Sequence, residues 1–236
     1  VVGRPAAPLR AELAQCPRPE QCLRHGKPGG TALELYQDCG RVLVLGDGNL
    51  TFSLALCRRL PDPRCVTATT YLTAAELVDT YDGSVLKTVA NLRRAGAMVL
   101  HGVDATALGT EACPLSRDAV FHRVLWNFPC VAPPTADREP GGDGQNEEME
   151  RNKVLLANFF ECSLDVLVPG GELHIVHKTK PPFCHWDLPA IASPFGYTLR
   201  ACLVFDRSSF AGYTNKKARS GAGSFPIFDA RTFIFT

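Results

Sequence analysis

The sequence has almost no excess charge and no long apolar run, and both absences limit what the protein can do. Its 236 residues include 25 Lys and Arg and 24 Asp and Glu, a formal net charge of +1. So balanced a chain has no overall basic field, and contact with a nucleic acid requires a local patch of cations. No run approaches 18 consecutive apolar residues, so we expect no membrane span and no membrane partner.

Two common catalytic motifs are also missing. The sequence contains neither the Gly-x-Ser-x-Gly element of serine hydrolases nor the His-Glu-x-x-His element of zinc proteases. His174 and His177 lie three positions apart in a predicted strand, so their side chains point to opposite faces and cannot share a metal. The sequence therefore disfavours both hydrolase classes.

The ten cysteines include no Cys-x-x-Cys pair, which argues against a disulfide scaffold and against paired zinc ligands. Cys57, Cys65, Cys162 and Cys202 lie within apolar patterns, where a free thiol behaves as a small hydrophobic side chain. We expect mostly reduced thiols, and hence a nuclear, nucleolar or cytoplasmic protein.

Residues 1–39 differ in composition from the rest of the chain, because Pro, Gly, Arg and Cys are frequent there. We predict a partly irregular N-terminal extension over this range. Cys16, Cys22, His25 and Cys39 are possible ligands, but their spacing does not match that of ordinary zinc modules. We therefore predict no metal site and place the folded domain at residues 40–236.

Residues 40–236 alternate between strand and helix patterns. Strands are predicted at residues 41–45, 65–70, 98–101, 120–126, 172–177, 198–205 and 231–236, and helices at 51–60, 74–95 and 148–167. The alternation indicates an α/β fold with parallel crossovers and helices on both faces of a seven-stranded sheet. Because no helix separates the last two strands, we expect a mostly parallel sheet with an antiparallel strand at its edge.

The loop Gly46-Asp47-Gly48-Asn49 follows an apolar strand and precedes a predicted helix, the context of a nucleotide-type ligand site. Glycine allows the backbone to approach a ligand closely and to adopt positive φ. Amide groups at the start of the helix favour an anion. Thr51 stands where the third Gly of a dinucleotide motif would fall, which disfavours a nicotinamide cofactor and leaves an adenosyl-methionine ligand open.

A carboxylate about 20 residues beyond such a loop normally binds the ribose hydroxyls, but the second strand offers none. That strand ends with Thr69, Thr70 and Tyr71, whose hydroxyls are weaker partners. After the third strand, Asp104 either accepts the adenine amino group or caps the following turn. With the glycine loop, we predict Thr69, Thr70 and Asp104 as cofactor-binding residues.

Taken in order, these motifs resemble one known family. The resemblance is carried by Leu43-Val-Leu-Gly-Asp-Gly-Asn-Leu-Thr-Phe-Ser-Leu-Ala-Leu56, Gly102-Val-Asp-Ala-Thr106, Asn127-Phe-Pro129, Asn152-Lys-Val-Leu-Leu-Ala-Asn-Phe-Phe160, Gly170-Gly-Glu172, Lys180-Pro-Pro-Phe183 with Trp186, and Gly212-Tyr213. They are similar to the Rossmann-like methyltransferases related to the yeast 25S ribosomal RNA uridine-N3 methyltransferase, which include the N-terminal domain of ferredoxin-fold anticodon-binding-domain proteins. The resemblance implies a class I methyltransferase fold, S-adenosylmethionine as cofactor, and methylation of uridine N3 in rRNA or tRNA, with no DNA partner.

Two positions depart from the family pattern. Leu72 stands where the family carries an Asp near the end of the second strand, and Cys130 stands where it carries a His. The first change removes a carboxylate from the cofactor site, and the second removes an imidazole near the substrate. Both motivate an alternative function, a catalytically inactive methyltransferase-fold scaffold that binds protein or RNA partners.

Asn127, Phe128 and Pro129 end the fourth strand beside the first strand, where ligands bind in open α/β sheets. Phe128 can stack on a base that has left its helix, and Asn127 can hydrogen-bond the edge of that base. We predict this tripeptide as catalytic, mainly by positioning the base nitrogen. The alternative is a structural role, with Phe128 in the core and Asn127 capping the strand.

Basic residues near the predicted site suggest how RNA would bind. Cations with an interleaved aromatic suit single-stranded RNA through phosphate contact and stacking, although such a loop can also be merely solvated. The residues predicted to bind the substrate are Lys178, Lys180, Tyr213, Lys216 and Lys217.

Overall fold

The computed structural model describes residues 34–36, 40–81, 83–131, 144–217 and 223–236. Its strands are β1 (Val42–Leu45), β2 (Val66–Thr69), β3 (Met98–Leu100), β4 (Phe121–Asn127), β5 (Leu167–Lys178), β6 (Leu199–Val204) and β7 (Ala230–Phe235). They form one seven-stranded sheet in the order β3-β2-β1-β4-β5-β7-β6. The pairs from β3 to β5 are parallel, and β7 is antiparallel to both β5 and β6. The mostly parallel seven-stranded sheet is confirmed, and the antiparallel strand lies one position inside the β6 edge.

The helices are α2 (Thr51–Cys57), α3 (Ala74–Tyr81), α4 (Ser84–Arg94), α5 (Gly144–Ser163) and α6 (Leu188–Ala192). Short 3-10 helices are η1 (Glu34–Tyr36), η2 (Pro63–Cys65), η3 (Phe183–Trp186), η4 (Ser193–Phe195) and η5 (Arg207–Ser209). The single helix predicted at 74–95 is two helices, with Gly83, a poor helix former, immediately before α4. None of the helices in the described ranges is long and apolar enough to cross a membrane.

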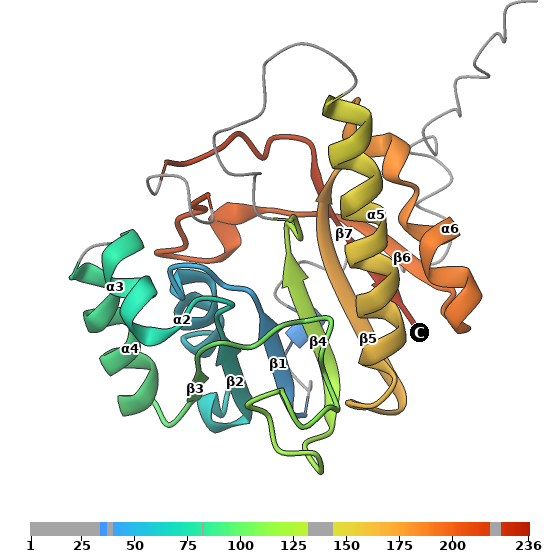
Figure 1. The fold of residues 1–236 in the computed structure, drawn as a ribbon. Coiled ribbons are helices and arrows are strands. Elements are labelled where there is room, and N and C mark those ends of the chain that lie inside the picture. The colour runs from blue at the N-terminus through green and yellow to red at the C-terminus, as the bar shows by residue number, and fades with distance from the viewer. Residues whose placement is uncertain (1–33, 37–39, 82, 132–143, 218–222) are drawn as a thin grey trace, which may run out of the picture.

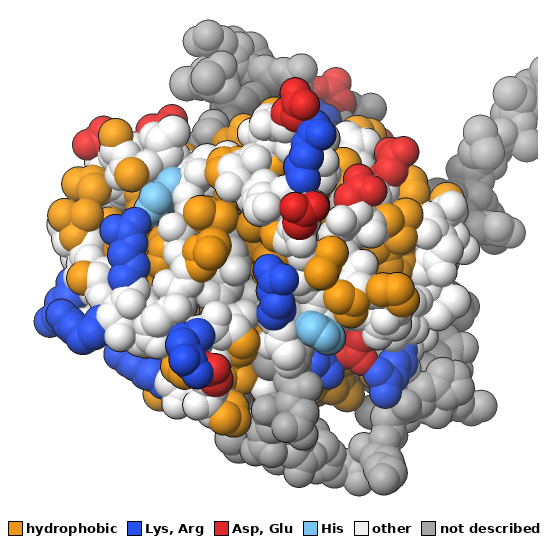
Figure 2. Space-filling model, turned by 90° about the horizontal axis from the view of Figure 1, so that it is seen from below, with side chains coloured by type: hydrophobic (Ala, Val, Ile, Leu, Met, Phe, Trp, Pro, Cys, Tyr) orange, Lys and Arg blue, Asp and Glu red, His pale blue; other side chains and the backbone are white. Residues whose placement is uncertain are grey.

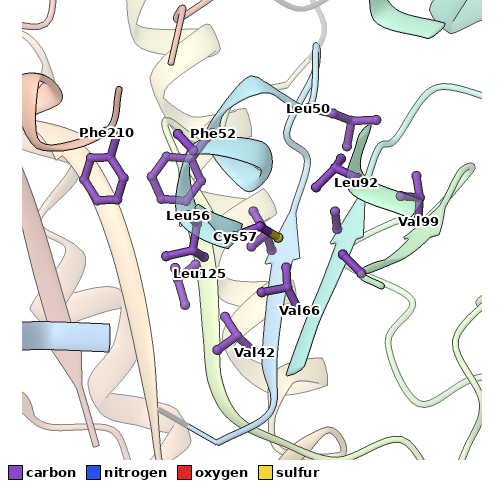
Figure 3. Close-up of a cluster of buried hydrophobic side chains, with 14 of the residues drawn as sticks. Val42, Leu50, Phe52, Leu56, Cys57, Val66, Leu92, Val99, Leu125 and Phe210 are labelled. Carbon is purple, nitrogen blue, oxygen red and sulfur yellow. The ribbon is translucent and has the colours of Figure 1, made fainter. Parts of the chain in front are cut away.

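Side chains alternate along β1 and fill one core on each face of the sheet, because successive residues of a strand point in opposite directions. Val42 and Val44 pack with α2 and α4, where Leu56 and Leu92 are fully buried (Figure 3). Leu43 and Leu45 pack on the opposite face against α5 and α6, with residues such as Phe159, Phe160 and Leu188. Helices on both faces explain why β1 is an unbroken apolar run.

The 3-10 helix η1 belongs to the folded domain although it precedes β1. Tyr36 is buried in the same core as Val42, and its hydroxyl lies 3.2 Å from Nδ1 of His174 on β5. The rest of the predicted extension, with Cys16, Cys22, His25 and Cys39, lies outside the described residues. The thiols of Cys57, Cys113, Cys130 and Cys162 are free, whereas Cys184 takes part in a disulfide.

The carboxyl ends of β1, β4 and β5 meet at one edge of the sheet, the upper edge in Figure 1. The orange and red chain that follows β6 runs across this edge above α2 before it enters β7. Figure 2 shows the opposite side, where Lys and Arg side chains are dispersed among apolar and acidic ones. The candidate site therefore lies at the edge above β1 and β4.

Candidate cofactor and substrate site

The glycine loop makes a sharp bend directly after β1. Gly46 has a φ of +58°, a conformation that glycine adopts readily and L-amino acids rarely adopt. Leu50 follows with a φ of +59°. A Cβ atom on Gly46 would lie 2.9 Å from Nε1 of Trp126 on the neighbouring strand β4. Both the backbone angle and this close approach therefore require glycine at position 46.

Asp47 supports the loop from inside the protein. Its Oδ2 accepts hydrogen bonds from the amide and the hydroxyl of Ser53, each at 2.7 Å, and its amide donates to the Thr69 carbonyl at 3.0 Å. Burial of the carboxyl raises the pKa of Asp47 to about 6. The carboxylate of Asp47 thus anchors the start of α2. The backbone of the loop, and not this side chain, is what faces the edge of the sheet.

Asn49 joins the loop to a distant part of the chain. Its Nδ2 donates to the carbonyl oxygen and the hydroxyl of Thr214, at 3.0 and 2.9 Å, and its Oδ1 accepts from the Thr51 hydroxyl at 2.7 Å. We call residues 211–217 the cover segment, because their contacts lie above the start of α2. Arg58 donates to the Ala211 carbonyl at 3.3 Å, which ties the other end of this segment to the same helix.

The remaining predicted cofactor ligands bind to groups of the protein itself. The Thr69 hydroxyl donates to the Val44 carbonyl at 2.9 Å, and the Thr70 hydroxyl donates to the Leu72 carbonyl at 2.8 Å. Asp104 accepts from the amide and hydroxyl of Thr106, at 2.8 and 2.7 Å, which is the turn-capping alternative. Binding a cofactor with these side chains requires a change of hydrogen-bond partner, so their assignment stays a prediction.

The tripeptide at the end of β4 has an unusual backbone. Phe128 has a φ of +53°, a sparsely populated region for an aromatic residue that occurs most often at functional sites. Its amide donates to the Val176 carbonyl of β5 at 2.8 Å, which holds this conformation. The Nδ2 atom of Asn127 is buried and has no hydrogen-bond partner among the described residues, and Pro129 is buried as well. An unpaired buried amide group beside a strained aromatic indicates a ligand-binding position.

Aromatic rings surround Phe128. Phe225 lies edge-on to it with ring centroids 5.1 Å apart, and Phe205 does so at 6.0 Å. Lys178 places its ammonium 4.6 Å from the ring centroid of Phe183 and 5.3 Å from that of Phe225. The ring of Phe128 is half-buried, so it combines both sequence interpretations, core contact on one side and exposure on the other.

The five predicted substrate residues separate into two groups. Lys178 ends β5 and Lys180 follows it, while Lys216 and Lys217 are exposed in the cover segment. Tyr213 packs edge-on against Phe52 at 5.4 Å, and burial raises the pKa of its hydroxyl, so it anchors the cover segment by packing. The four lysines flank the edge on which Phe128 lies.

One residue over the glycine loop was missed by sequence reasoning. Tyr81, the last residue of α3, covers Gly48 so closely that a Cβ there would overlap its hydroxyl, and this hydroxyl donates to the Lys217 carbonyl at 3.3 Å. Burial raises the pKa of Tyr81 to about 12, so the phenol stays protonated. No local signal marks this residue, because its role depends on α3 packing against a segment more than 130 positions away.

A family model matches residues 43–217, which include the glycine loop, Phe128 and the whole cover segment. The model is that of the BMT5-like proteins, described as rRNA (uridine-N3-)-methyltransferase BTM5-like. The chain belongs to the BMT5-like family.

Two relatives and one solved structure are similar to this chain over most of its length. The chain is 29% identical over 205 residues to the uncharacterized protein At4g26485 of Arabidopsis thaliana, covering 85% of this chain and 94% of the relative. It is 31% identical over 207 residues to the ferredoxin-fold anticodon-binding domain-containing protein 1 homolog of Mus musculus, covering 83% of this chain and 31% of that protein. The chain thus spans nearly all of the first relative and about a third of the second. Among solved structures, the glycopeptide N-methyltransferase MtfA overlaps 84% of this chain and 88% of its own, with 15% identity and a TM-score of 0.49.

Membership of the BMT5-like family of methyltransferases confirms the cofactor expected from the sequence, S-adenosylmethionine. The backbone of the loop fits that cofactor. The amides of Gly48 and Asn49 donate no hydrogen bond to any described residue, and together they would receive the carboxylate of its methionine part.

The ribose end of the site fits less well. Leu72, at the position of the family's Asp, is buried in the core beside α2 and α4, and its side chain offers no acceptor. The hydroxyls of Thr69 and Thr70 already bind backbone carbonyls. The BMT5-like loop is therefore retained while the carboxylate that normally holds a ribose is absent.

Proposed function

We propose that this BMT5-like chain methylates N3 of a uridine in RNA, with S-adenosylmethionine as methyl donor. The observation that carries the proposal is the pair Asn127 and Phe128 next to the glycine loop. Because Leu45 of β1 pairs with Trp126 of β4, the loop that begins at Gly46 and the tripeptide that begins at Asn127 leave adjacent strands at the same level. A donor on the loop and a base on Phe128 would thus be neighbours.

The chemistry of uracil explains why these two side chains suit the task. N3 lies between two carbonyl groups, and when its proton passes to solvent water, negative charge spreads onto both carbonyl oxygens. The unpaired Nδ2 of Asn127 can donate to one of them and stabilise this charge. Phe128 would hold the face of the ring, so that N3 points toward the methyl group. S-adenosylmethionine supplies the methyl group when it is bound.

RNA as the substrate class is supported by the surroundings of Phe128. Lys178 lies against two aromatic rings of the site, and Lys180, Lys216 and Lys217 add positive charge nearby. Such a mixture binds phosphates and stacked bases of single strands. A nuclear, nucleolar or cytoplasmic location follows as a proposal from an rRNA or tRNA substrate.

Nucleoside profiling of cellular RNA tests the proposal. We expect 3-methyluridine to disappear at one site of rRNA or tRNA from cells that lack the protein, and to return on expression of the wild-type chain. Expression of Asn127→Ala should not restore it. Unchanged levels of every methylated nucleoside would refute the proposal.

Leu72 favours a second candidate function, a catalytically inactive scaffold of the same fold. Its buried apolar side chain replaces a family carboxylate, and the other predicted ligands are hydrogen-bonded internally. Isothermal titration calorimetry with S-adenosylmethionine and with its demethylated product separates the two functions. An enzyme binds both compounds, whereas a scaffold shows no heat with either.

A further inference from the structure

One large aromatic side chain on the site edge has no structural role in the described chain. Phe228 is 96% exposed, on the turn that leads into β7. A single exposed apolar residue is ordinary on a protein surface. Phe228 differs from such a residue, because its turn is held by hydrogen bonds and lies close to the proposed base site.

The turn is fixed by the residue after Phe228. Oδ2 of Asp229 accepts hydrogen bonds from the amides of Thr179 and Lys180, at 3.1 and 2.9 Å, and its carbonyl accepts from the Thr179 hydroxyl at 2.8 Å. These bonds clamp the turn to the chain that leaves β5. Phe228 is thus displayed at a fixed place beside Lys180.

The same turn leads back to the proposed base site. Phe225, three residues earlier, lies edge-on to Phe128 at 5.1 Å and beneath the ammonium of Lys178 at 5.3 Å. Asp229 is the acid that interacts electrostatically with Lys178, and its carboxylate is already used by two backbone amides. The strip of residues 225–229 therefore runs from the edge of Phe128 to an exposed ring, with lysines alongside.

We propose that Phe228 stacks on a nucleotide of single-stranded RNA next to the methylated uridine, while Lys178 and Lys180 contact the adjoining phosphates. This inference rests on the proposed RNA substrate. An exposed ring beside cations matches the alternation of flat bases and anionic phosphates in a single strand. Stacking between a base and an aromatic depends on the ring and little on base identity, so Phe228 would contribute affinity more than sequence preference.

Fluorescence anisotropy with a labelled oligouridine and the full chain tests the assignment. We expect Phe228→Ala to weaken binding by roughly 5- to 150-fold, the range for loss of one base–aromatic stack, and Phe228→Trp to restore it. Met98→Ala is the matched control, because Met98 is 57% exposed at the amino end of β3, and it should bind as the wild type does.

The dependence on salt separates stacking from charge. Phe228→Ala should keep the wild-type slope of log affinity against log salt, whereas Lys180→Gln should reduce that slope by about 0.7. If the wild type binds RNA and Phe228→Ala binds equally well, this inference is overturned and the proposed function stands. If the wild type binds no RNA, the proposed function fails with it. Loss of a protein partner by Phe228→Ala, with RNA binding unchanged, would assign the ring to a protein interface instead.

Discussion

Replacing Asp47 by Asn should make the protein more stable at neutral pH. The carboxyl group is buried, and its pKa of about 6 exceeds the ordinary 3.8 by about two. A pKa difference of one between the folded and unfolded chains corresponds to about 1.36 kcal/mol. Ionisation of Asp47 therefore lowers the free energy of unfolding by up to about 3 kcal/mol. An amide cannot ionise, and its Oδ1 can still accept the hydrogen bond from the Ser53 amide.

The sign of the pH dependence follows from the raised pKa. Below pH 3.8 the carboxyl is protonated in both folded and unfolded chains, so wild type and Asp47→Asn should be about equally stable there. As the pH rises to 6, the unfolded chain releases the proton first and the wild type loses stability relative to the variant. His177, whose pKa burial lowers to about 4, titrates in the same range but is common to both proteins. Tyr81, which also faces Asp47, titrates far above it.

Urea denaturation followed by circular dichroism, at intervals from pH 4 to pH 8, measures this difference. The variant should gain over the wild type between pH 4 and pH 6 and keep the gain above pH 6. Asp79→Asn, which removes an exposed carboxylate from α3, controls for the loss of one charge. A constant difference across the range, or a variant less stable than the wild type at pH 8, would show that Asp47 is not a buried, poorly solvated carboxyl group.

Three further predictions concern the loop, the base site and the sheet. Gly46→Ala should lower the unfolding free energy by about 1–3 kcal/mol in denaturation experiments, because of the φ of +58° and the nearby Trp126; it should also weaken S-adenosylmethionine binding in calorimetry. Asn127→Ala should reduce methyl transfer by about 100-fold in a radiolabel assay while the melting temperature stays unchanged. Glu172→Gln should destabilise the fold by about 3 kcal/mol at pH 7. The Glu172 carboxylate, hydrogen-bonded to His174, has a pKa lowered to about 2, so this difference should shrink as the pH falls from 4.5 toward 2 in acid denaturation.

The strands of the sheet could be predicted from the sequence, because each strand is marked by a local pattern of apolar residues. The apolar run before Gly46 and the glycine bend after it predict a central strand and a ligand loop, and β1 and Gly46 occupy these positions. Similar runs located five of the other six strands to within about one residue at each end, whereas β5 begins at Leu167, inside the range predicted as the end of a helix. The division of the helix at Gly83 was missed, since apolar periodicity continues across the break.

The cover over the loop depends on contacts that no local pattern records. Thr214 bonds Asn49, and the Lys217 carbonyl receives the hydroxyl of Tyr81, across separations of 165 and 136 positions. Phe225 packs against Phe128, which also lies far from it in the sequence. Such pairs arise when the segment after β6 crosses the sheet edge, and the sequence indicates the segment but not its path.

The most direct test of the account is methyl transfer by the purified chain. The protein would be incubated with RNA from cells that lack it and with S-adenosylmethionine labelled in its methyl group, and the RNA would then be digested to nucleosides. We expect label in 3-methyluridine with the wild type and almost none with Asn127→Ala. Absence of label from every nucleoside, with a protein that is folded, would contradict methyl transfer by this site.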